Sequence, residues 1–409
     1  MTEICIYAQV HQPYRLRQFR LFDIGSGGDY FDTETNRGIL RRVADKCYLP
    51  ANRLLADLIR RSGGEFKVAL SLSGALLDQC AEWAPDVLQS FQELVATGGV
   101  ELLGETYYHS LAALISPEEF AEQVERHRQA IHRWFGQRPT VFRNTELIYW
   151  DGLAPVVARL GFRGMMVEGA DHVMGWRSSN HVYESASAPG LRLIPRNYRL
   201  SDDVGFRFSN RGWDGWPLTS EKYADWLRQS GGDSLHLFVD YETFGEHQWA
   251  DTGIFDFLAQ LPWECFRRGL GFAHPSELAA RGPVASLSFE RPTSWADIER
   301  DTTAWLGNRL QYAAQERLYG LRDAVLASGD PRRIEDWRRL TTSDHLYYMC
   351  TKWFADGDVH KYFSPYDSPY DAFVAFMNVA QDLEQAVAEA ASGGVQEDWV
   401  AAAGLAGVA

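Results

Sequence analysis

The sequence predicts an α/β fold, a β/α barrel followed by a bundle of helices, and two observations support this. Over the first two thirds of the chain, short continuous apolar runs alternate with helical stretches. Continuous apolar runs are typical of parallel strands covered on both faces, and their alternation with helices is typical of a barrel. From about residue 294 the apolar residues recur every three or four positions, which indicates helices.

Eight apolar runs are the candidate strands, and the last of them is the weakest signal. They are Ile4–Val10, Phe66–Leu72, Val100–Leu103, Thr140–Arg143, Gly164–Val167, Arg192–Pro195, Leu235–Val239 and Gly271–His274. One helix between them is well signalled. Ser116 is placed to cap it, Pro117 suits its first turn and Glu119 completes a capping box, while Gly136 marks its end.

Three long helices are predicted after the barrel, and together they form a bundle. Their ranges are Ser294–Ala327, Asp330–Ala355 and Tyr370–Ala391. The segment 14–36 is rich in Gly, Asp and Phe and is a candidate loop over the barrel mouth, with its mobility left open.

Polar side chains follow six of the predicted strands at the point where each strand ends. They are His11-Gln-Pro13, Ser71 with Ser73, Gly104-Glu-Thr-Tyr-Tyr-His-Ser110, Glu146, Glu168 and Asp240. One such residue is readily explained as the start of a solvated loop. In a β/α barrel, however, the carboxyl ends of the strands form the face that carries the active site. Six polar strand ends therefore predict a shared site.

Two of these segments deliver carboxylates suited to the cleavage of a glycosidic bond. Phe142-Arg-Asn-Thr-Glu-Leu-Ile-Tyr149 carries Glu146, and Phe238-Val-Asp-Tyr-Glu-Thr-Phe-Gly-Glu-His247 carries Asp240. Cleavage needs one carboxylate as nucleophile or base and another as proton donor. Arg143 would keep Glu146 ionised, whereas Tyr241 and Glu242 would raise the pKa of Asp240, as a proton donor requires. Taken singly, an acidic residue at a strand end is more often a helix cap or an ion-pair partner.

Charge and composition disfavour several classes of function. The chain has 40 basic and 55 acidic residues among 409, a net charge of −15. Nucleic acids and anionic membranes bind basic surfaces, so neither is an expected partner. The 14 Trp and 18 Tyr residues suit stacking on sugar rings, although core packing is their commoner use.

The cysteines and the apolar runs predict a cytoplasmic location. The five cysteines are odd in number and include no CxxC pair, which is typical of free thiols in a reducing compartment. No signal peptide is visible, and no apolar run approaches the roughly 20 residues that span a bilayer.

Five segments occur in a distinctive order along the chain. They are His11-Gln-Pro13, Gly104-Glu-Thr-Tyr-Tyr-His-Ser110, Phe142-Arg-Asn-Thr-Glu146, Asp240-Tyr-Glu-Thr-Phe-Gly-Glu-His247 and Thr342-Ser-Asp-His-Leu-Tyr-Tyr-Met349. In this combination the chain resembles glycoside hydrolase family 57, and within it the α-amylase group. The two central segments are specific together, whereas His-Gln-Pro alone is weak. The segment Trp353-Phe-Ala-Asp-Gly-Asp-Val-His360 is also similar to that group.

The resemblance implies a retaining enzyme acting on α-1,4-glucans, built as an incomplete (β/α)7 barrel followed by a helical bundle. It implies Glu146, at the fourth strand end, as nucleophile and Asp240, at the seventh, as general acid/base, in agreement with the strand count above. The residues expected to bind the sugar are His11, Glu105, His109, Trp150, Glu242, His247, Trp249, Asp344, His345 and Trp353. Among them, Trp150, Trp249 and Trp353 are the candidate stacking platforms.

The sequence does not decide which molecule accepts the glycosyl group, because a glycosyl-enzyme is captured by a sugar as well as by water. A 4-α-glucanotransferase or a glucan branching enzyme of the same family is therefore the alternative. A metal-dependent deacetylase would need an Asp and a His-x3-His set after early strands, which is absent. A carbohydrate-binding protein that had lost catalysis would lack one of the two carboxylates.

No metal or other cofactor is expected. Although four of the candidate site residues are histidines, the chain has no HExxH or H-x-H spacing, so hydroxyl binding is the better explanation. The expected partner is an α-glucan or maltooligosaccharide. The oligomeric state, the preferred chain length and any α-1,6 activity stay open.

These inferences divide the chain into three parts. We expect a catalytic barrel over residues 1–290, a helical bundle over 291–391 that completes the cleft, and a flexible tail over 392–409.

Overall fold

The computed structural model describes residues 2–352 and 364–405, with side chains to residue 390. The chain forms two compact units. The first consists of Met1–Gln12, Arg37–His109 and Pro117–Thr302, and the second of Pro13–Asn36, Ser110–Ser116 and Thr303–Ala409. The functional domains expected over 1–290 and 291–391 stay a prediction. No helix among the described residues combines the length and the apolar character needed to cross a membrane.

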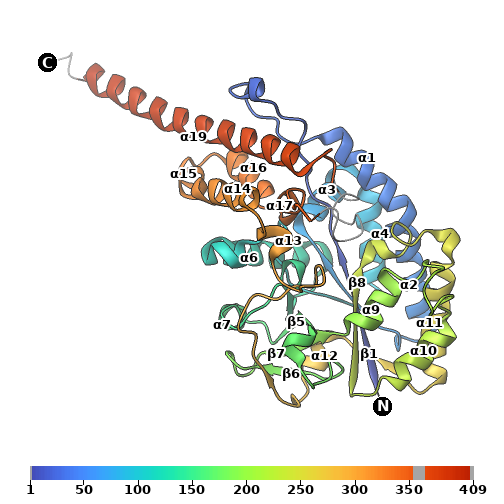
Figure 1. Ribbon diagram of the computed structural model, residues 1–409. Coiled ribbons are helices and arrows are strands. Elements are labelled where there is room, and N and C mark those ends of the chain that lie inside the picture. The colour runs from blue at the N-terminus through green and yellow to red at the C-terminus, as the bar shows by residue number, and fades with distance from the viewer. Residues whose placement is uncertain (1, 353–363, 406–409) are drawn as a thin grey trace. The chain divides into compact units, whose positions relative to one another are not determined.

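The strands all lie in the first unit (Figure 1). They are β1 (Glu3–Val10), β2 (Val68–Leu72), β3 (Val100–Leu102), β4 (Val141–Arg143), β5 (Gly164–Glu168), β6 (Tyr183–Ser185), β7 (Arg192–Arg196), β8 (Ser234–Asp240), β9 (Gly271–Phe272) and β10 (Ser286–Leu287). Seven of the eight predicted strands match β1–β5, β7 and β8 closely.

These seven strands form a ring. β3, β2, β1 and β8 are adjacent and parallel, as are β4, β5 and β7. A bridge between Gly104 and Phe142 joins β3 to β4. The Asn197 N–H, just after β7, donates to the His236 carbonyl of β8 at 2.8 Å. The prediction of a seven-stranded β/α barrel is confirmed, with regular pairing interrupted at these two joins.

Alternate residues of each strand point to opposite sides, as the pleat requires. Tyr7, Ala69, Met166 and Phe238 belong to one buried cluster that draws a residue from nearly every strand of the ring, which is the barrel interior. Their neighbours, such as Ala8 and Leu70, belong to a second cluster shared with the surrounding helices.

Helices of the first unit cover the outside of the ring, with α2, α10 and α11 beside β1 and β8 (Figure 1). They are α1 (Thr33–Val43, which begins in the second unit), α2 (Leu49–Arg61), α3 (Gly74–Trp83), α4 (Pro85–Val95), α6 (Pro117–Phe135), α7 (Ala154–Arg159), α8 (Asp171–Met174), α9 (Tyr198–Gly205), α10 (Ser220–Gln229), α11 (Ile254–Arg267) and α12 (Pro275–Ala279). The well-signalled helix is α6, and Gly136 follows it with φ 72°.

The eighth predicted strand is β9, which pairs only with the start of β1 and stays outside the ring. The sequence analysis missed β6, which is antiparallel to β7, and β10, which pairs with β6. Both have three residues or fewer, too short for an apolar pattern to stand out.

The second unit is helical, but the first two predicted helices are broken into shorter ones, whereas the third, predicted over Tyr370–Ala391, is the longer α19 (Pro369–Leu405). The helices of this unit are α5 (Ala112–Ile115), α13 (Thr303–Leu306), α14 (Arg309–Gly320), α15 (Arg322–Ala327), α16 (Pro331–Leu340), α17 (Ser343–Tyr347) and α19. The prediction of one helix over Ser294–Ala327 was wrong. Residues 294–302 form a turn, and Asn308 starts a new helix by capping the Gln311 N–H at 3.0 Å.

The second predicted helix is interrupted as well. It breaks after α16, where Thr342 leaves the helical conformation with φ −51° and ψ 133° and bridges to Ser110.

The segment 13–36 packs on α19 within the second unit. Asp382 accepts hydrogen bonds from the Gly25 N–H at 2.6 Å and from the Tyr30 hydroxyl at 2.7 Å. The Asn378 amide donates to the Phe19 carbonyl at 3.1 Å. These contacts tie the proposed loop to a helix at several points along its length.

Candidate active site

The polar strand ends of the first unit lie at one level. Gln9 of β1 is in register with Ser71 of β2 on one side and with Asp240 of β8 on the other. Glu105 follows β3 and Glu146 follows β4. Contacts described below join Glu105 to Glu146, and the strand register brings Gln9, Ser71 and Asp240 to the same level, so polar ends gather at one end of the ring as the barrel prediction requires.

Glu146 lies in a strained turn directly after β4. Its backbone is left-handed with φ 58°, and that of Leu147 has φ 54°. His109, which contacts Glu146, has φ 53°. Non-glycine residues rarely adopt this region, and each instance costs on the order of 1–3 kcal/mol. Such strain persists where the surroundings enforce it and is concentrated at functional sites.

His109 links two glutamates. Its Nε2 lies 3.0 Å from Glu146 Oε1, and its Nδ1 lies 3.4 Å from Glu105 Oε2. Burial alone would lower the pKa of His109, but the hydrogen bonds to Glu105 and Glu146 raise it to about 9. The ring is therefore protonated at neutral pH, donates from both nitrogens and places a positive charge beside Glu146.

This charge sets the ionisation of Glu146. Burial alone would raise the pKa of Glu146, but the hydrogen bond and charge of His109, the charge of Arg143 and a bond from Trp295 hold it below its usual value. Arg143 is fully buried, and its guanidinium nitrogens have no hydrogen-bond partner among the described residues. Its effect on Glu146 is therefore one of charge through space, in the direction that the sequence predicted.

His11 and Gln9 support the imidazole from β1 and the residues that follow it. The rings of His11 and His109 stack with their centroids 4.3 Å apart, and His11 Nδ1 lies 2.6 Å from Ser73 Oγ. The side-chain amide of Gln9 lies 3.0 Å from His109 Nε2. The predicted residues His11, Glu105 and His109 thus belong to one connected group with Glu146.

Asp240 has the opposite environment. Burial and the negative charge of Glu146 raise its pKa to about 6, against the influence of Arg143 and Arg196. A carboxyl group in this range still carries a proton in mildly acidic solution. The two candidate catalytic residues are thus set apart in pKa, as the division between nucleophile and proton donor requires.

Glu242 is kept neutral beside Asp240. Burial and the charge of Asp240 raise the pKa of Glu242 to about 8. The Tyr48 hydroxyl donates a hydrogen bond to it and accepts one from the Gln12 amide at 3.3 Å. Near pH 7 Glu242 is therefore mostly protonated and adds little negative charge next to Asp240.

Trp295 is a site residue that the sequence analysis missed. Its indole Nε1 donates to Glu146 Oε2 at 2.8 Å, and its backbone N–H donates to the Glu146 carbonyl at 3.3 Å. The apolar spacing placed this tryptophan in a helix of the bundle. The available signal was Pro292-Thr-Ser, a turn-forming composition directly before it.

Several predicted sugar-binding residues stand apart from this group. Among the described residues, no hydrogen bond or ring contact joins Trp150 or Trp249 to Glu146 or Asp240. Trp249 is 58% exposed, with Lys46 Nζ 5.4 Å from its ring centroid. His247 is half-buried, and burial lowers its pKa to about 4.

Asp344 and His345 lie on α17 in the second unit, where His345 contacts the rings of Tyr348 and Phe376. Their part in the site stays a prediction. Trp353 lies outside the described residues.

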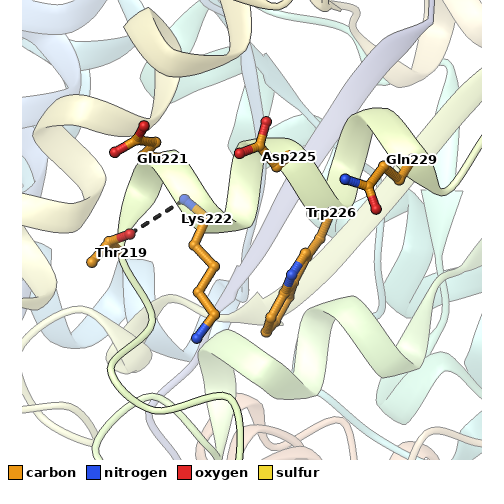
Figure 2. A pocket seen from close by; sticks show the side chains of 6 residues that line it. All are labelled: Thr219, Glu221, Lys222, Asp225, Trp226 and Gln229. Atoms are coloured by element: carbon orange, nitrogen blue, oxygen red, sulfur yellow. Dashed lines mark hydrogen bonds between the residues drawn. The ribbon is translucent and has the colours of Figure 1, made fainter.

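A surface pocket lies along α10, apart from the strand-end group (Figure 2). Its lining residues are Thr219, Glu221, Lys222, Asp225, Trp226 and Gln229. Thr219 caps the helix by accepting from the Lys222 N–H at 3.2 Å, and Asp225 is paired with Arg268 at 2.6 Å.

In the described part of the chain, no three His, Cys, Asp or Glu side chains gather as a metal site would require.

Paired carboxylates with separated pKa values at the strand ends of a β/α barrel are the equipment of a glycoside hydrolase. The sequence model for glycosyl hydrolase family 57 matches residues 5–287, and the chain belongs to this family. A curated protein of Methanocaldococcus jannaschii, named "Putative alpha-amylase", is 41% identical over 400 residues. That alignment covers 93% of this chain and 84% of the relative. The resemblance inferred from the motifs is confirmed.

Solved structures share the fold at low identity. A family 57 branching enzyme from Thermococcus kodakaraensis has a TM-score of 0.66 at 14% identity, covering 88% of this chain and 87% of that one. The α-amylase AmyC of Thermotoga maritima has a TM-score of 0.58 at 14% identity, covering 93% of each chain.

A longer enzyme also matches. The 4-α-glucanotransferase of Thermococcus litoralis has a TM-score of 0.65 at 15% identity over 84% of this chain, which spans 56% of that enzyme's length. Matches at identities this low show the fold alone. The reaction has to be inferred from the residues of the site.

Proposed function

We propose that the chain is a retaining α-1,4-glucan hydrolase of the α-amylase type, with Glu146 as nucleophile and Asp240 as general acid/base. The observation that carries the proposal is the opposite setting of the two carboxylates. His109, Arg143 and Trp295 keep Glu146 ionised, while burial and the charge of Glu146 raise the pKa of Asp240 to about 6. One group is prepared to attack and the other to donate a proton.

In the first step, Glu146 attacks the anomeric carbon while Asp240 gives its proton to the departing glycosidic oxygen. The bond between that carbon and oxygen breaks, and a glycosyl ester forms on Glu146. In the second step, Asp240 takes a proton from water, whose oxygen attacks the same carbon and releases Glu146. Two displacements on one carbon retain its configuration.

The remaining residues would hold the sugar. His11, Glu105 and His109 lie in the group around Glu146, and Glu242 follows Asp240, so they are placed to act on the bound glucose unit or to shape its surroundings. Trp150, His247, Trp249, Asp344, His345 and Trp353 are proposed as further contacts. This mechanism uses side chains alone, on an α-glucan substrate. A cytoplasmic location is proposed with it, supported by five cysteines that are all buried and not joined in disulfides.

The alternative is transfer to a second glucan, as in a 4-α-glucanotransferase or a branching enzyme. The T. litoralis structure is named a 4-α-glucanotransferase and the T. kodakaraensis structure a branching enzyme, which is the reason to test for transfer. Incubation with maltoheptaose separates the two, because hydrolysis gives only shorter products and transfer gives longer ones as well.

The nucleophile assignment is tested with Glu146→Gln. This variant should lose measurable turnover while it keeps its fold and its affinity for maltooligosaccharides. Near-normal turnover would disprove the assignment.

A further inference from the structure

The turn that carries Trp295, residues 293–302, has an unusual backbone. Asp297 and Arg300 are left-handed, with φ 55° and 52°. They are two of the five non-glycine residues with positive φ in the described part of the chain. The other three are His109, Glu146 and Leu147. Strain of this kind persists only where surrounding contacts impose it.

Backbone contacts close this turn onto the segment that holds Glu146. Thr293 exchanges two hydrogen bonds with Tyr149, at 2.9 and 3.0 Å. The Ser294 N–H donates to the Arg300 carbonyl at 3.1 Å, which folds the turn back on itself. Trp295 therefore leaves the turn at a fixed point, directly beside the carboxylate.

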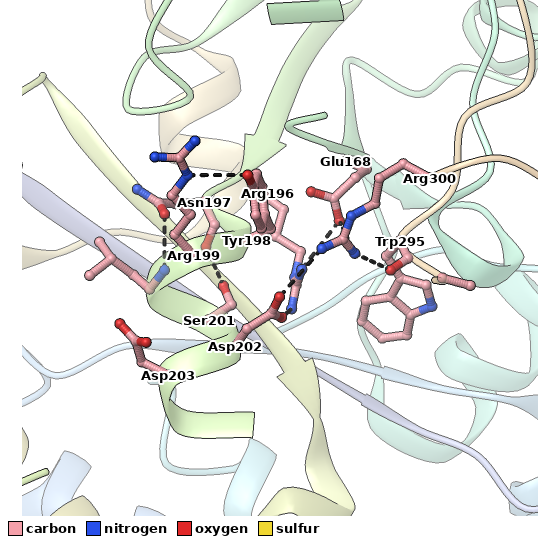
Figure 3. Close-up of polar contacts among 12 residues, drawn as sticks. Glu168, Arg196, Asn197, Tyr198, Arg199, Ser201, Asp202, Asp203, Trp295 and Arg300 are labelled. Carbon is pink, nitrogen blue, oxygen red and sulfur yellow. Dashed lines mark hydrogen bonds and ion pairs between the residues drawn. The ribbon is translucent and has the colours of Figure 1, made fainter. Parts of the chain in front are cut away.

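Arg300 ties the turn to two other elements (Figure 3). Its guanidinium donates to the Trp295 carbonyl and pairs with Glu168 of β5 at 3.9 Å and with Asp202 of α9 at 3.4 Å. Arg196 of β7 pairs with the same two carboxylates, at 3.3 and 2.6 Å. Glu168 is fully buried and Arg300 is only 17% exposed, so this network is shielded from water.

The network also shapes the surroundings of the indole. The guanidinium carbons of Arg143 and Arg196 lie 4.9 and 5.7 Å from the centre of the Trp295 ring. Cations at this range are attracted to the face of an indole. The ring is held on its backbone side by Arg300 and on its faces by two further arginines, with its N–H directed at Glu146.

We propose that Arg300 is a positioning residue: anchored by Glu168 and Asp202, it fixes the 293–302 turn so that the Trp295 indole N–H stays on the nucleophile Glu146. The proposal rests on the proposed role of Glu146. Arg300 touches no reacting atom and acts through Trp295. It explains why two arginines and two carboxylates are assembled behind a tryptophan, and why the turn tolerates two left-handed residues.

The test uses the pH dependence of kcat/KM for α-maltotriosyl fluoride. Fluoride leaves without protonation, so the acid limb of this profile reports the ionisation of the nucleophile alone. Trp295→Phe removes one hydrogen bond from the ionised carboxylate and should move the acid limb to higher pH, by roughly one pH unit. Arg300→Met should move it in the same direction, and Arg300→Lys should restore part of the change.

The double variant Trp295→Phe with Arg300→Met separates positioning from a direct effect of charge. If Arg300 acts through Trp295, the double variant has the same acid limb as Trp295→Phe alone. The matched control is Arg199→Met. Arg199 lies on the neighbouring helix α9 and pairs with Asp171 at 3.1 Å, and among the described residues its side chain makes no hydrogen bond or ion pair with the turn, so the acid limb of this variant should not move.

The inference is overturned if Trp295→Phe leaves the acid limb in place, or if the shifts of the two single variants add in the double variant. It is also overturned if Arg300→Met lowers only the melting temperature. Should Arg300→Met fail to fold, Trp295→Phe and Arg300→Lys decide the question. An inactive Glu146→Gln together with unmoved acid limbs rejects this inference alone, whereas an active Glu146→Gln rejects the proposed function itself.

Discussion

Replacing His109 with Gln should remove a pH-dependent part of the stability of this protein. The imidazolium lies between Glu105 and Glu146 and is 2% exposed, so solvent screens the interaction weakly. Its pKa rises from 6.5 to about 9 in the folded protein. At about 1.4 kcal/mol per pKa unit, this displacement corresponds to about 3.5 kcal/mol of folding free energy.

The sign follows from the direction of the shift. Because the folded-state pKa lies above the unfolded value, the contribution is complete below about pH 6.5 and is lost as the pH rises through about 9. At an unfolding entropy of about 2 cal/mol/K per residue, about 3.5 kcal/mol corresponds to about 4 °C in the melting temperature of a chain of this length. His109→Gln should therefore be less stable by about this amount at pH 6 and by much less at pH 9.5.

The assay is thermal unfolding followed by circular dichroism at several values between these limits, with the wild type and the variant compared at each pH. Glu242, whose pKa is raised to about 8, also titrates in this range, but its contribution is common to both proteins and cancels. His127→Gln is the matched control. Burial lowers the pKa of His127, so its loss should change with pH only near the unfolded value of about 6.5, and in the opposite direction to the loss of His109, costing less at pH 6 than at higher pH. A constant difference between wild type and His109→Gln would refute the reasoning.

Three further predictions follow from the site. The profile of kcat/KM on maltooligosaccharides should fall on its basic side near pH 6, where Asp240 loses its proton, and on its acid side below the usual glutamate range; a profile that stays flat to pH 8 would contradict this. Asp240→Asn should lose on the order of 10²–10⁴ in rate on maltoheptaose and far less in forming the glycosyl-enzyme from a glucosyl fluoride; equal losses on both substrates would count against the acid role. Asp344→Ala should lower kcat/KM with little change in melting temperature, as for a sugar contact that tightens in the transition state, and full activity would reject the sugar-binding role proposed for Asp344.

The barrel and its carboxylates were predictable because both depend on local pattern. The strands of the ring are short, largely apolar runs, and each run stops where the chain leaves the barrel, so the polar residues that follow it mark one face. The positions of Glu146 and Asp240 follow directly from this rule. Their pKa values could be predicted only in direction, because His109 and Trp295 reach Glu146 from distant parts of the chain.

The local sequence gives only one sign of the Trp295 turn, the turn-forming composition Pro292-Thr-Ser, because most of what enforces the turn comes from elsewhere in the chain. Its residues Asp297 and Arg300 adopt a backbone that local propensity disfavours, and the contacts that enforce it come from β5 and α9. The apolar spacing of Ser294–Ala327 fits a helix. Nothing in the segment itself indicates that its residues contact the carboxylates of Glu168 and Asp202. Tertiary contacts therefore override the helical spacing of the local sequence at the position where the site has the Trp295 N–H as a fixed hydrogen-bond donor.

The two carboxylates are coupled in a way that matches the two steps of the proposed mechanism. The negative charge of Glu146 is the second largest cause of the raised pKa of Asp240, after burial. When Glu146 becomes a glycosyl ester, that charge disappears, while the positive charges of Arg143 and Arg196 stay and favour the carboxylate form of Asp240. The pKa of Asp240 therefore falls once the glycosyl ester has formed. Asp240 stays ionised and acts as the base in the second step. Hydrolysis of the ester restores the charge on Glu146 and with it the raised pKa, so one pair of residues resets itself in each turnover.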